Sequence, residues 1–294
     1  MVRRALGAVA VAGAATLAWA LVEAHAFTLR RVTVPVLPRG ADPIRILHLS
    51  DLHLTPGQRD KIAWVRSLAS EPVDLVVTTG DNLAHPLAVP PLLGAYEPLM
   101  SRPGLFVFGS NDYFGPRPKN PLAYFGGPSL LHREAVELPS EDLRARLTAG
   151  GWKDVNNART SLEVNGTRIR VVGLDDPHIG RDKLPSGRRP RADLTLGIVH
   201  APYRRALEAL ADDGAQLILA GHTHGGQVCI PGVGALVTNC DLDTARVKGL
   251  STWPDADGAW LHVSAGLGTS PYAPIRFACR PEATVLTLVE RGDD

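Results

Sequence analysis

Residue types that bind metal ions follow five short, mainly apolar segments of this chain, in each case where the segment ends. The segments span residues 44–49, 74–78, 105–108, 194–199 and 216–220, and the groups that follow them are Asp51 and His53, Asp81 and Asn82, Asn111 and Asp112, His200, and His222 and His224. Ligands of open α/β sheets gather at the carboxyl ends of the strands. We therefore expect these five groups of side chains to converge on one site.

The spacing of these residues favours a centre of two metal ions. Asp51 and His53 lie two residues apart on an extended chain, so both can reach the same ion. His222 and His224 are also two residues apart, but in a turn bounded by glycines, which lets the two imidazoles point at neighbouring ions. Asp81 has two carboxylate oxygens and can bridge the pair.

A site of oxygen and imidazole ligands without thiolate is typical of Mn, Fe or Zn. The three cysteines, Cys229, Cys240 and Cys279, are too few and too scattered for a thiolate cage. We therefore expect two divalent metal ions as cofactors. Such a pair lowers the pKa of bound water and holds the attacking and leaving oxygens of an in-line displacement, so the site favours phosphoester hydrolysis.

Short β-rich segments alternate with helical stretches after residue 27, which is the pattern of an α/β domain. Apolar residues recur at helical spacing in residues 60–70 and 203–210, between the strand segments. Clusters of Pro and Gly indicate loops, because periodic segments resume soon after each, and we predict one domain at residues 27–291. Lys plus Arg number 31 and Asp plus Glu 30, so no net field favours nucleic acid as a partner.

The N-terminal segment, residues 1–26, is predicted to be a membrane anchor or a signal segment. Residues 5–22 carry no charge, follow two arginines and end before Glu23. Their length is close to the lower limit for a helix that crosses a bilayer. Two interpretations stay open: a retained anchor, which the length favours, and a signal peptide cut after Ala26. Both place the domain outside the cytoplasmic membrane, anchored or secreted.

The order of these motifs resembles that of the calcineurin-like metallophosphoesterases. The matching stretches are Leu49-Ser50-Asp51-Leu52-His53, Thr79-Gly80-Asp81-Asn82 and Ala220-Gly221-His222-Thr223-His224-Gly225-Gly226-Gln227. A similarity to the membrane-associated bacterial phosphodiesterase branch lies in Gly173-Leu174-Asp175-Asp176-Pro177, Gly266-Leu267-Gly268-Thr269 and Arg276-Phe277. The resemblance covers the chain after residue 27.

The resemblance implies a four-layer α/β/β/α sandwich of the metallophosphoesterase type, here preceded by an N-terminal apolar helix. It also implies two metal ions. By matching position, Asp51, His53, Asp81 and His224 would hold one ion, and Asp81, Asn111, His200 and His222 would hold the other. We further expect substrate contacts at Asn82, Gly225 and Gly226, and a catalytic role for His200 beside the phosphoryl oxygens.

The third motif departs from the family pattern, which is Gly-Asn-His followed by an acid, with the His assisting the leaving group. This chain reads Gly109-Ser110-Asn111-Asp112-Tyr113. If Asn111 is the metal ligand, Asp112 takes the place of the catalytic His. If Tyr113 fixes the register, Ser110 and Asn111 replace the ligand and the His. We favour the first register, because an amide oxygen binds metal better than Ser, and predict that Asp112 is catalytic if burial raises its pKa.

The predicted function is hydrolysis of a phosphodiester or phosphomonoester by a hydroxide that bridges two metal ions, outside the cytoplasmic membrane. Lipid head groups and envelope polymers are the candidate substrates, and residues 5–22 are the predicted membrane contact. Because the usual His is missing, a second hypothesis is a membrane-tethered phospholigand-binding protein with weak or lost catalysis. His85 and His178 are alternative proton donors, and His48 is expected to be a hydrogen-bonded core residue.

Overall fold

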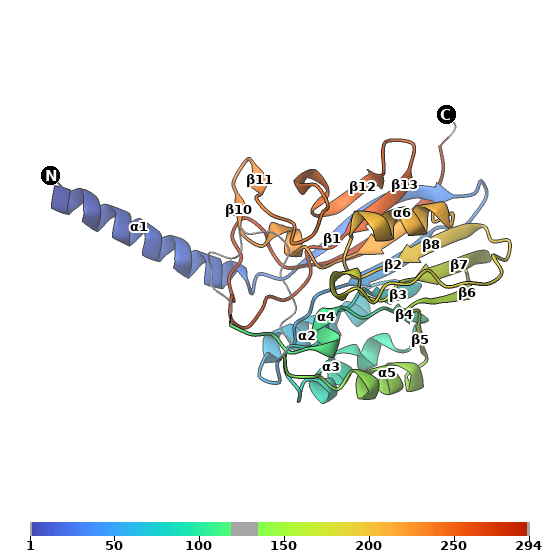
Figure 1. Cartoon of the computed structure of the whole chain (residues 1–294), viewed down its shortest axis with the longest axis horizontal. Helices are drawn as coiled ribbons and strands as arrows, with labels where there is room; N and C mark the ends of the chain where they lie inside the picture. Colours follow the sequence, from blue (N-terminus) through green and yellow to red (C-terminus); the bar gives the residue numbers. More distant parts are fainter. Residues whose placement is uncertain (1, 119–134, 293–294) are drawn as a thin grey trace.

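The computed structural model describes residues 2–118 and 135–292 and contains two six-stranded sheets (Figure 1). The first sheet has the strand order β1 (Thr28–Leu37), β14 (Glu282–Glu290), β2 (Ile44–Leu49), β3 (Leu75–Thr78), β4 (Gly104–Phe106), β5 (Trp152–Asp154). The second has the order β12 (Gly249–Trp253), β13 (Ala259–Val263), β9 (Leu217–Ala220), β8 (Leu194–Ile198), β7 (Thr167–Gly173), β6 (Ala158–Val164). A separate ribbon pairs β10 (Cys229–Ile230) with β11 (Gly234–Ala235).

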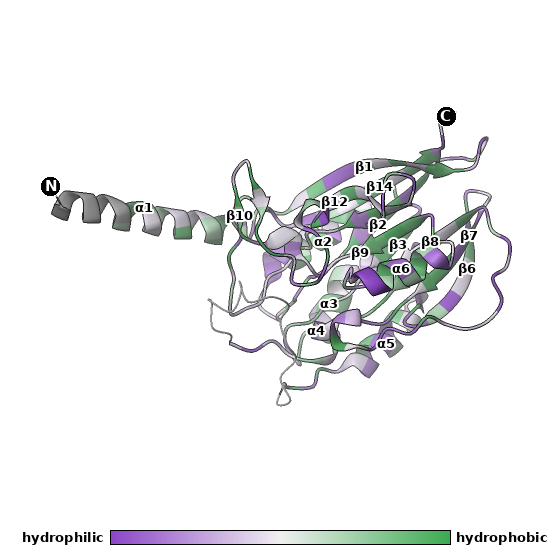
Figure 2. Cartoon of the chain, turned by 45° about the horizontal axis from the view of Figure 1, so that its top comes forward, coloured by the Kyte–Doolittle hydropathy of each residue, from purple (hydrophilic) through white to green (hydrophobic). Residues whose placement is uncertain are grey.

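The two sheets pack face to face, because successive side chains of a strand point to opposite faces and both faces of these strands are apolar. Ile46 and Val77 of the first sheet share one buried cluster with Ile198 and Leu219 of the second. Figure 2 shows these central strands largely in the green of hydrophobic residues. The inter-sheet layer is therefore the main core of the domain.

Helices cover the outer faces of both sheets. Against the first sheet pack α2 (Arg59–Ser67), α3 (Val89–Tyr96) and α5 (Ser140–Ala149). Against the second packs α6 (Arg204–Asp212), which buries Ala206, Leu207 and Leu210. A short helix, α4 (Ser110–Tyr113), follows β4. The predicted α/β architecture, with sheets flanked by helices, is confirmed.

Parallel pairing brings the predicted site segments to one edge. β2, β3 and β4 are parallel neighbours in the first sheet, and β7, β8 and β9 in the second. The five predicted strands are confirmed: β2 has the predicted bounds, whereas β4 ends at Phe106, two residues earlier than expected. Since parallel strands end at the same side of a sheet, the five following loops lie close together.

The N-terminal helix α1 (Val2–Glu23) projects from the sandwich and contacts it with its last turn (Figure 1). The Glu23 carboxylate accepts hydrogen bonds from the backbone N–H groups of Ala278 (3.1 Å) and Cys279 (2.7 Å). Across the part of the chain that the structure describes, every helix falls short of the length or apolar character that a membrane crossing requires. The predicted span at residues 5–22 therefore has no support from the described residues.

Candidate metal centre

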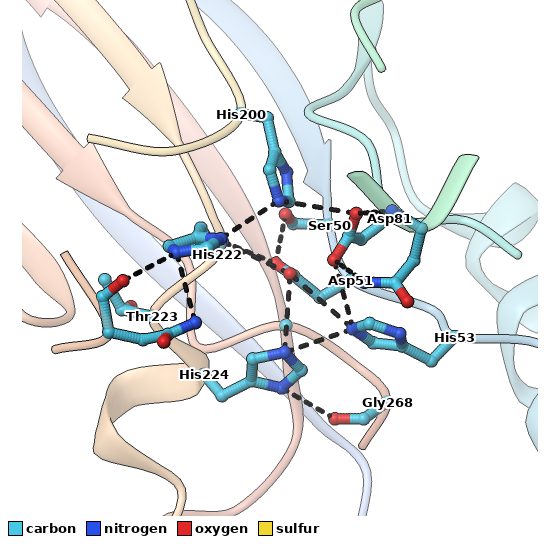
Figure 3. Close-up of polar contacts among 12 residues, drawn as sticks. Ser50, Asp51, His53, Asp81, His200, His222, Thr223, His224 and Gly268 are labelled. Carbon is cyan, nitrogen blue, oxygen red and sulfur yellow. Dashed lines mark hydrogen bonds and ion pairs between the residues drawn. The ribbon is translucent and has the colours of Figure 1, made fainter. Parts of the chain in front are cut away.

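Candidate ligand side chains from both sheets meet at the edge where the strands end (Figure 3). Two sets each offer three ligand atoms within 4.8 Å of one another: Asp51, His53 and His224, and Asp51, Asp81 and His200. They come from the loops after β2, β3, β8 and β9. Residues that lie up to 173 positions apart in the chain are thus brought together as ligands of one candidate centre.

Asp81 lies between the two sets. Its Oδ2 is 3.5 Å from Nε2 of His53, and its Oδ1 is 3.5 Å from Nε2 of His200. The two sets of close atoms share Asp51 rather than Asp81. However, the imidazoles of His53 and His224 both face the same oxygen of Asp51, Oδ1. The two oxygens of Asp81 face different imidazoles, so Asp81 is the better placed of the two carboxylates to bridge two ions.

His200 and His222 each turn one ring nitrogen towards the other. Nδ1 of His200 donates to the carbonyl of Thr79 (2.7 Å). Nε2 of His222 lies 3.1 Å from the carbonyl of Asn239 and 3.2 Å from its side-chain amide nitrogen, and it donates to the nearer carbonyl. The remaining ring nitrogens, Nε2 of His200 and Nδ1 of His222, lie 3.3 Å apart. Two acceptor nitrogens at this separation need a cation or a proton between them.

His53 and His224 form a second pair of facing imidazoles. Their Nε2 atoms are 3.1 Å apart, and the rings are stacked. Nδ1 of His224 lies nearer the carbonyl of Gly268 (3.1 Å) than the guanidinium of Arg276 (3.4 Å), so it donates to Gly268 and leaves Nε2 as acceptor. Nδ1 of His53 is buried and has no hydrogen-bond partner. The donor set thus fits cations at both ends of Asp81.

The charge balance of the centre also indicates a site for cations. Burial lowers the pKa of His53 to about 4 and that of His224 well below its usual range, so both imidazoles are neutral and can bind metal. Burial also lowers the pKa of His200, but the carboxylates of Asp81, Asp176 and Asp51 outweigh it and raise the pKa well above its usual range. A proton on His200 therefore offsets the buried negative charge that a cation would neutralise.

The backbone of the ligand residues is strained. Positive φ angles occur at Asp51 (51°), His53 (42°), Asp81 (53°), His222 (70°) and His224 (50°). This conformation is uncommon for residues other than glycine and costs roughly 1–3 kcal/mol each, so it persists only where the surroundings impose it. Strain of this kind concentrates at functional sites, which supports the choice of these five residues as ligands.

Asn111 and Asp112 turn in different directions from α4. The backbone N–H of Asn111 donates to Oδ1 of Asp81 (2.7 Å), and its side-chain amide lies 2.8 Å from Oδ2. The Asp112 carboxylate instead accepts from the N–H groups of Gly109 (3.0 Å) and Asn82 (2.9 Å). Burial, with the charge of Asp81, raises the pKa of Asp112 to about 7. Asn111 is therefore beside the candidate ligands. Asp112 instead holds the backbone of the loop at Gly109 and Asn82, and the catalytic role of Asp112 stays a prediction.

The three predicted substrate-binding residues use their polar groups within the fold. Oδ1 of Asn82 accepts from the hydroxyls of Thr78 (3.1 Å) and Tyr96 (2.7 Å). The N–H of Gly225 donates to the Thr223 hydroxyl, and that of Gly226 to the Thr223 carbonyl. These contacts shape the loops that carry Asp81 and His224. Direct contact of the three residues with substrate stays a prediction.

Of the alternative proton donors, only one lies beside the described centre. The ring of His178 is 4.6 Å from that of His222, and its Nδ1 is 3.0 Å from the hydroxyl of Tyr203. His85 accepts a hydrogen bond from the backbone N–H of Leu87 in its own exposed turn. Position thus favours His178 over His85.

Asp176 lies outside the predicted set of site residues but belongs to the centre. It is fully buried after β7, and its Oδ1 accepts from the backbone N–H of His178 (2.9 Å). Its Oδ2 is buried without a hydrogen-bond partner. Burial and the nearby Asp81 raise the pKa of Asp176 to about 7, although the field of His200 lowers it. The signal was present in the sequence, since an acid follows this apolar strand as it does β2, β3 and β4.

Replacing Asp176 by Asn should stabilise the metal-free protein at alkaline pH. The pKa of Asp176 is about 7 in the folded state and near 3.9 when unfolded, so the folded protein loses stability as pH rises from 4 through 7. Asn cannot ionise, and the variant should be more stable by up to ~4 kcal/mol at pH 8, with no difference near pH 4. Urea unfolding in EDTA at both pH values measures this. Lower stability of the variant at pH 8 would show that the carboxylate has a partner.

Carboxylate and imidazole side chains gathered at one edge, where two helix-flanked sheets end, are the groups that metal-dependent phosphoesterases use. A model of the calcineurin-like phosphoesterase family matches residues 44–226, more than half of the chain. The chain belongs to this family and is a phosphoester hydrolase. The match starts at the first residue of β2 and ends just after His224, so it contains all the predicted ligands.

The similarity to named relatives extends beyond residues 44–226. The phosphodiesterase YaeI of Escherichia coli (strain K12) is 27% identical over 272 residues, which are 90% of this chain and 88% of that protein. The metallophosphoesterase YkuE of Bacillus subtilis (strain 168) is 27% identical over 262 residues, 86% and 82% of the two chains. Among solved structures, a dimetal phosphatase from Danio rerio covers 77% of this chain and 88% of its own, with 12% identity and a TM-score of 0.42.

Proposed function

We propose that the chain hydrolyses phosphodiesters at a centre of two divalent metal ions, Mn, Fe or Zn, that share Asp81. The observation that carries this proposal is the pair of facing imidazoles at each end of the Asp81 carboxylate, with nitrogens 3.1 Å and 3.3 Å apart. When bound, two such ions would lower the pKa of a water held between them and stabilise the charge on the phosphoryl oxygens.

Backbone carbonyl groups would orient the histidine ligands of these ions. The carbonyls of Thr79, Asn239 and Gly268 accept one N–H from each of three histidines, so the other ring nitrogen is free to bind metal. Such outer contacts fix ring orientation and tautomer. Burial excludes water from the ligands and strengthens their interaction with charge.

A diester is favoured over a monoester for two reasons. The relative YaeI is named a phosphodiesterase. In addition, a cavity of about 400 Å³ lined by Lys61, His25 and Thr269 reaches Gly268, whose carbonyl contacts His224. A second ester group would find room there, beyond the phosphorus.

Hydrolysis of a chromogenic bis-ester and of the matching mono-ester by protein reconstituted with Mn²⁺ tests the proposal. We expect turnover of the bis-ester with the higher kcat/KM, loss of activity in EDTA, and recovery when Mn²⁺ is returned. Protein that binds two equivalents of Mn²⁺ but hydrolyses neither ester would overturn it and favour a phospholigand-binding role.

We also propose that residues 5–22 direct the domain to, or across, the cytoplasmic membrane. In support, α1 exposes apolar side chains, among them Val11 (71% exposed) and Val22 (60%). Alkaline phosphatase fused to the C-terminus should be active only if the domain lies outside the cytoplasm. An inactive fusion recovered with the soluble cell contents would rule this location out.

A further inference from the structure

A chain of hydrogen bonds crosses the core from the second sheet to the ligand Asp51. Nδ1 of His262 on β13 lies 2.9 Å from Nδ1 of His48 on β2. Nε2 of His48 is 3.0 Å from the hydroxyl of Thr79, which is 2.7 Å from the hydroxyl of Ser50. The Ser50 hydroxyl is 2.5 Å from Oδ2 of Asp51. All five side chains are at most 1% exposed.

The direction of every bond in this chain follows from the last one. A carboxylate only accepts, so Ser50 donates to Asp51, and Thr79 must then donate to Ser50. Because the Thr79 proton is used, Nε2 of His48 must donate to Thr79. A neutral His48 then accepts at Nδ1, and His262 is the donor at the far end. All four donors thus point towards Asp51.

Both histidines have the protonation state that this direction requires. Burial, with His262 nearby, lowers the pKa of His48 well below its usual range, and burial lowers that of His262 to about 4. Each ring therefore carries one N–H at neutral pH. Polar groups buried in an apolar layer are costly unless they are hydrogen-bonded, and here the two rings from opposite sheets satisfy each other.

We propose that His262, His48, Thr79 and Ser50 are positioning residues that hold Asp51 in the orientation for binding metal. The inference rests on the proposed metal centre. The chain of hydrogen bonds holds Oδ2 of Asp51, which also accepts from the backbone N–H of His222 (3.0 Å), while Oδ1 is turned to Nε2 of His224 (3.6 Å) and of His53 (3.9 Å). The Thr79 hydroxyl directs the Ser50 proton to Oδ2. Without it the Ser50 hydroxyl can turn away, and the carboxylate, held only by the His222 N–H, can rotate so that Oδ1 leaves both imidazoles. Outer partners of metal ligands typically contribute 10- to 100-fold to metal affinity.

Thr79→Val tests this role with little change in shape. It removes the hydroxyl in the middle of the chain but keeps the Thr79 carbonyl that contacts His200. The matched control is Thr284→Val: Thr284 is fully buried on β14, pairs in register with His48, and has a hydroxyl without a hydrogen-bond partner. Thr79→Ser keeps the hydroxyl and should restore the wild-type behaviour.

Binding of Co²⁺ to metal-free protein, followed by calorimetry and by the visible d–d spectrum, gives readouts besides activity. We expect Thr79→Val to weaken binding of Co²⁺ about 10-fold or more and to change its spectrum. Thr284→Val and Thr79→Ser should match the wild type in both. Urea unfolding of each metal-free variant identifies any loss that comes from misfolding alone.

The outcomes separate this inference from the proposed function. Wild-type protein that binds no Co²⁺ would overturn the metal centre itself. Wild-type binding that is unchanged in folded Thr79→Val would overturn only the positioning role. The remote variant His262→Phe should weaken binding of Co²⁺ as well. Combining it with Thr79→Val should add little, because either change alone already interrupts the chain of hydrogen bonds.

Discussion

Asp81→Asn should lower kcat/KM for a phosphodiester about 1,000-fold and reduce bound metal from two equivalents to one or none. The two carboxylate oxygens of Asp81 face His53 and His200 at 3.5 Å, and the amide nitrogen of Asn cannot bind a cation. Losing several kcal/mol of charge stabilisation corresponds to about three powers of ten in rate. Steady-state kinetics and elemental analysis of the same purified protein measure both effects.

The matched control for Asp81→Asn is Asp212→Asn, which removes the carboxylate of an exposed residue at the end of α6. It should leave rate and metal content unchanged. Full activity of Asp81→Asn would contradict the bridging role and, with it, the proposed two-metal centre. Reduced activity with two ions still bound would place Asp81 outside the ligand set.

Asn111→His should raise kcat for esters with poor leaving groups, by about 100-fold. A positioned proton donor typically contributes 10²- to 10⁴-fold, and the family's usual His is absent from this motif. Asn111 is the residue of α4 that contacts both oxygens of Asp81, so an imidazole there would stand beside the leaving oxygen. Activated p-nitrophenyl esters should gain much less, because their leaving group needs no proton.

Asp112→His is the contrasting variant. Its carboxylate accepts backbone N–H groups from Gly109 and Asn82, so a His there should destabilise the loop and give no gain in rate. A gain at position 112 and none at 111 would support the register that the sequence favoured. No gain at either position, with a substantial native rate, would contradict the idea that the native chain lacks an efficient donor.

The positions of the candidate ligands were predictable because two simple rules act together. Short apolar segments formed the expected buried strands, and parallel pairing carried the loops after them to one edge. The order of elements then placed Asp51, Asp81, His200 and His224 in one centre, although no contact between them is visible in the sequence.

The direction of individual side chains was not predictable, because it depends on backbone angles that sequence patterns do not specify. Asp112 and Asn111 are neighbours, yet only one turns towards Asp81. His48 was correctly predicted as a hydrogen-bonded core residue, but its partner His262 lies on the other sheet, 214 positions along the chain. The partnerless oxygen of Asp176 likewise appears only once the fold buries it.

The attachment of α1 has a practical consequence for work on this enzyme. Arg276 is fully buried between α1 and the candidate ligand His224: its backbone N–H donates to the Ala20 carbonyl (3.0 Å), and its guanidinium to the His224 carbonyl (3.3 Å). Recombinant protein shortened to begin at Phe27 would lose this contact and the Glu23 carboxylate. Arg276 would then be held less firmly, and the position of His224 would be less well fixed. Trimming should stop ahead of Ala20, and affinity tags belong at the C-terminus.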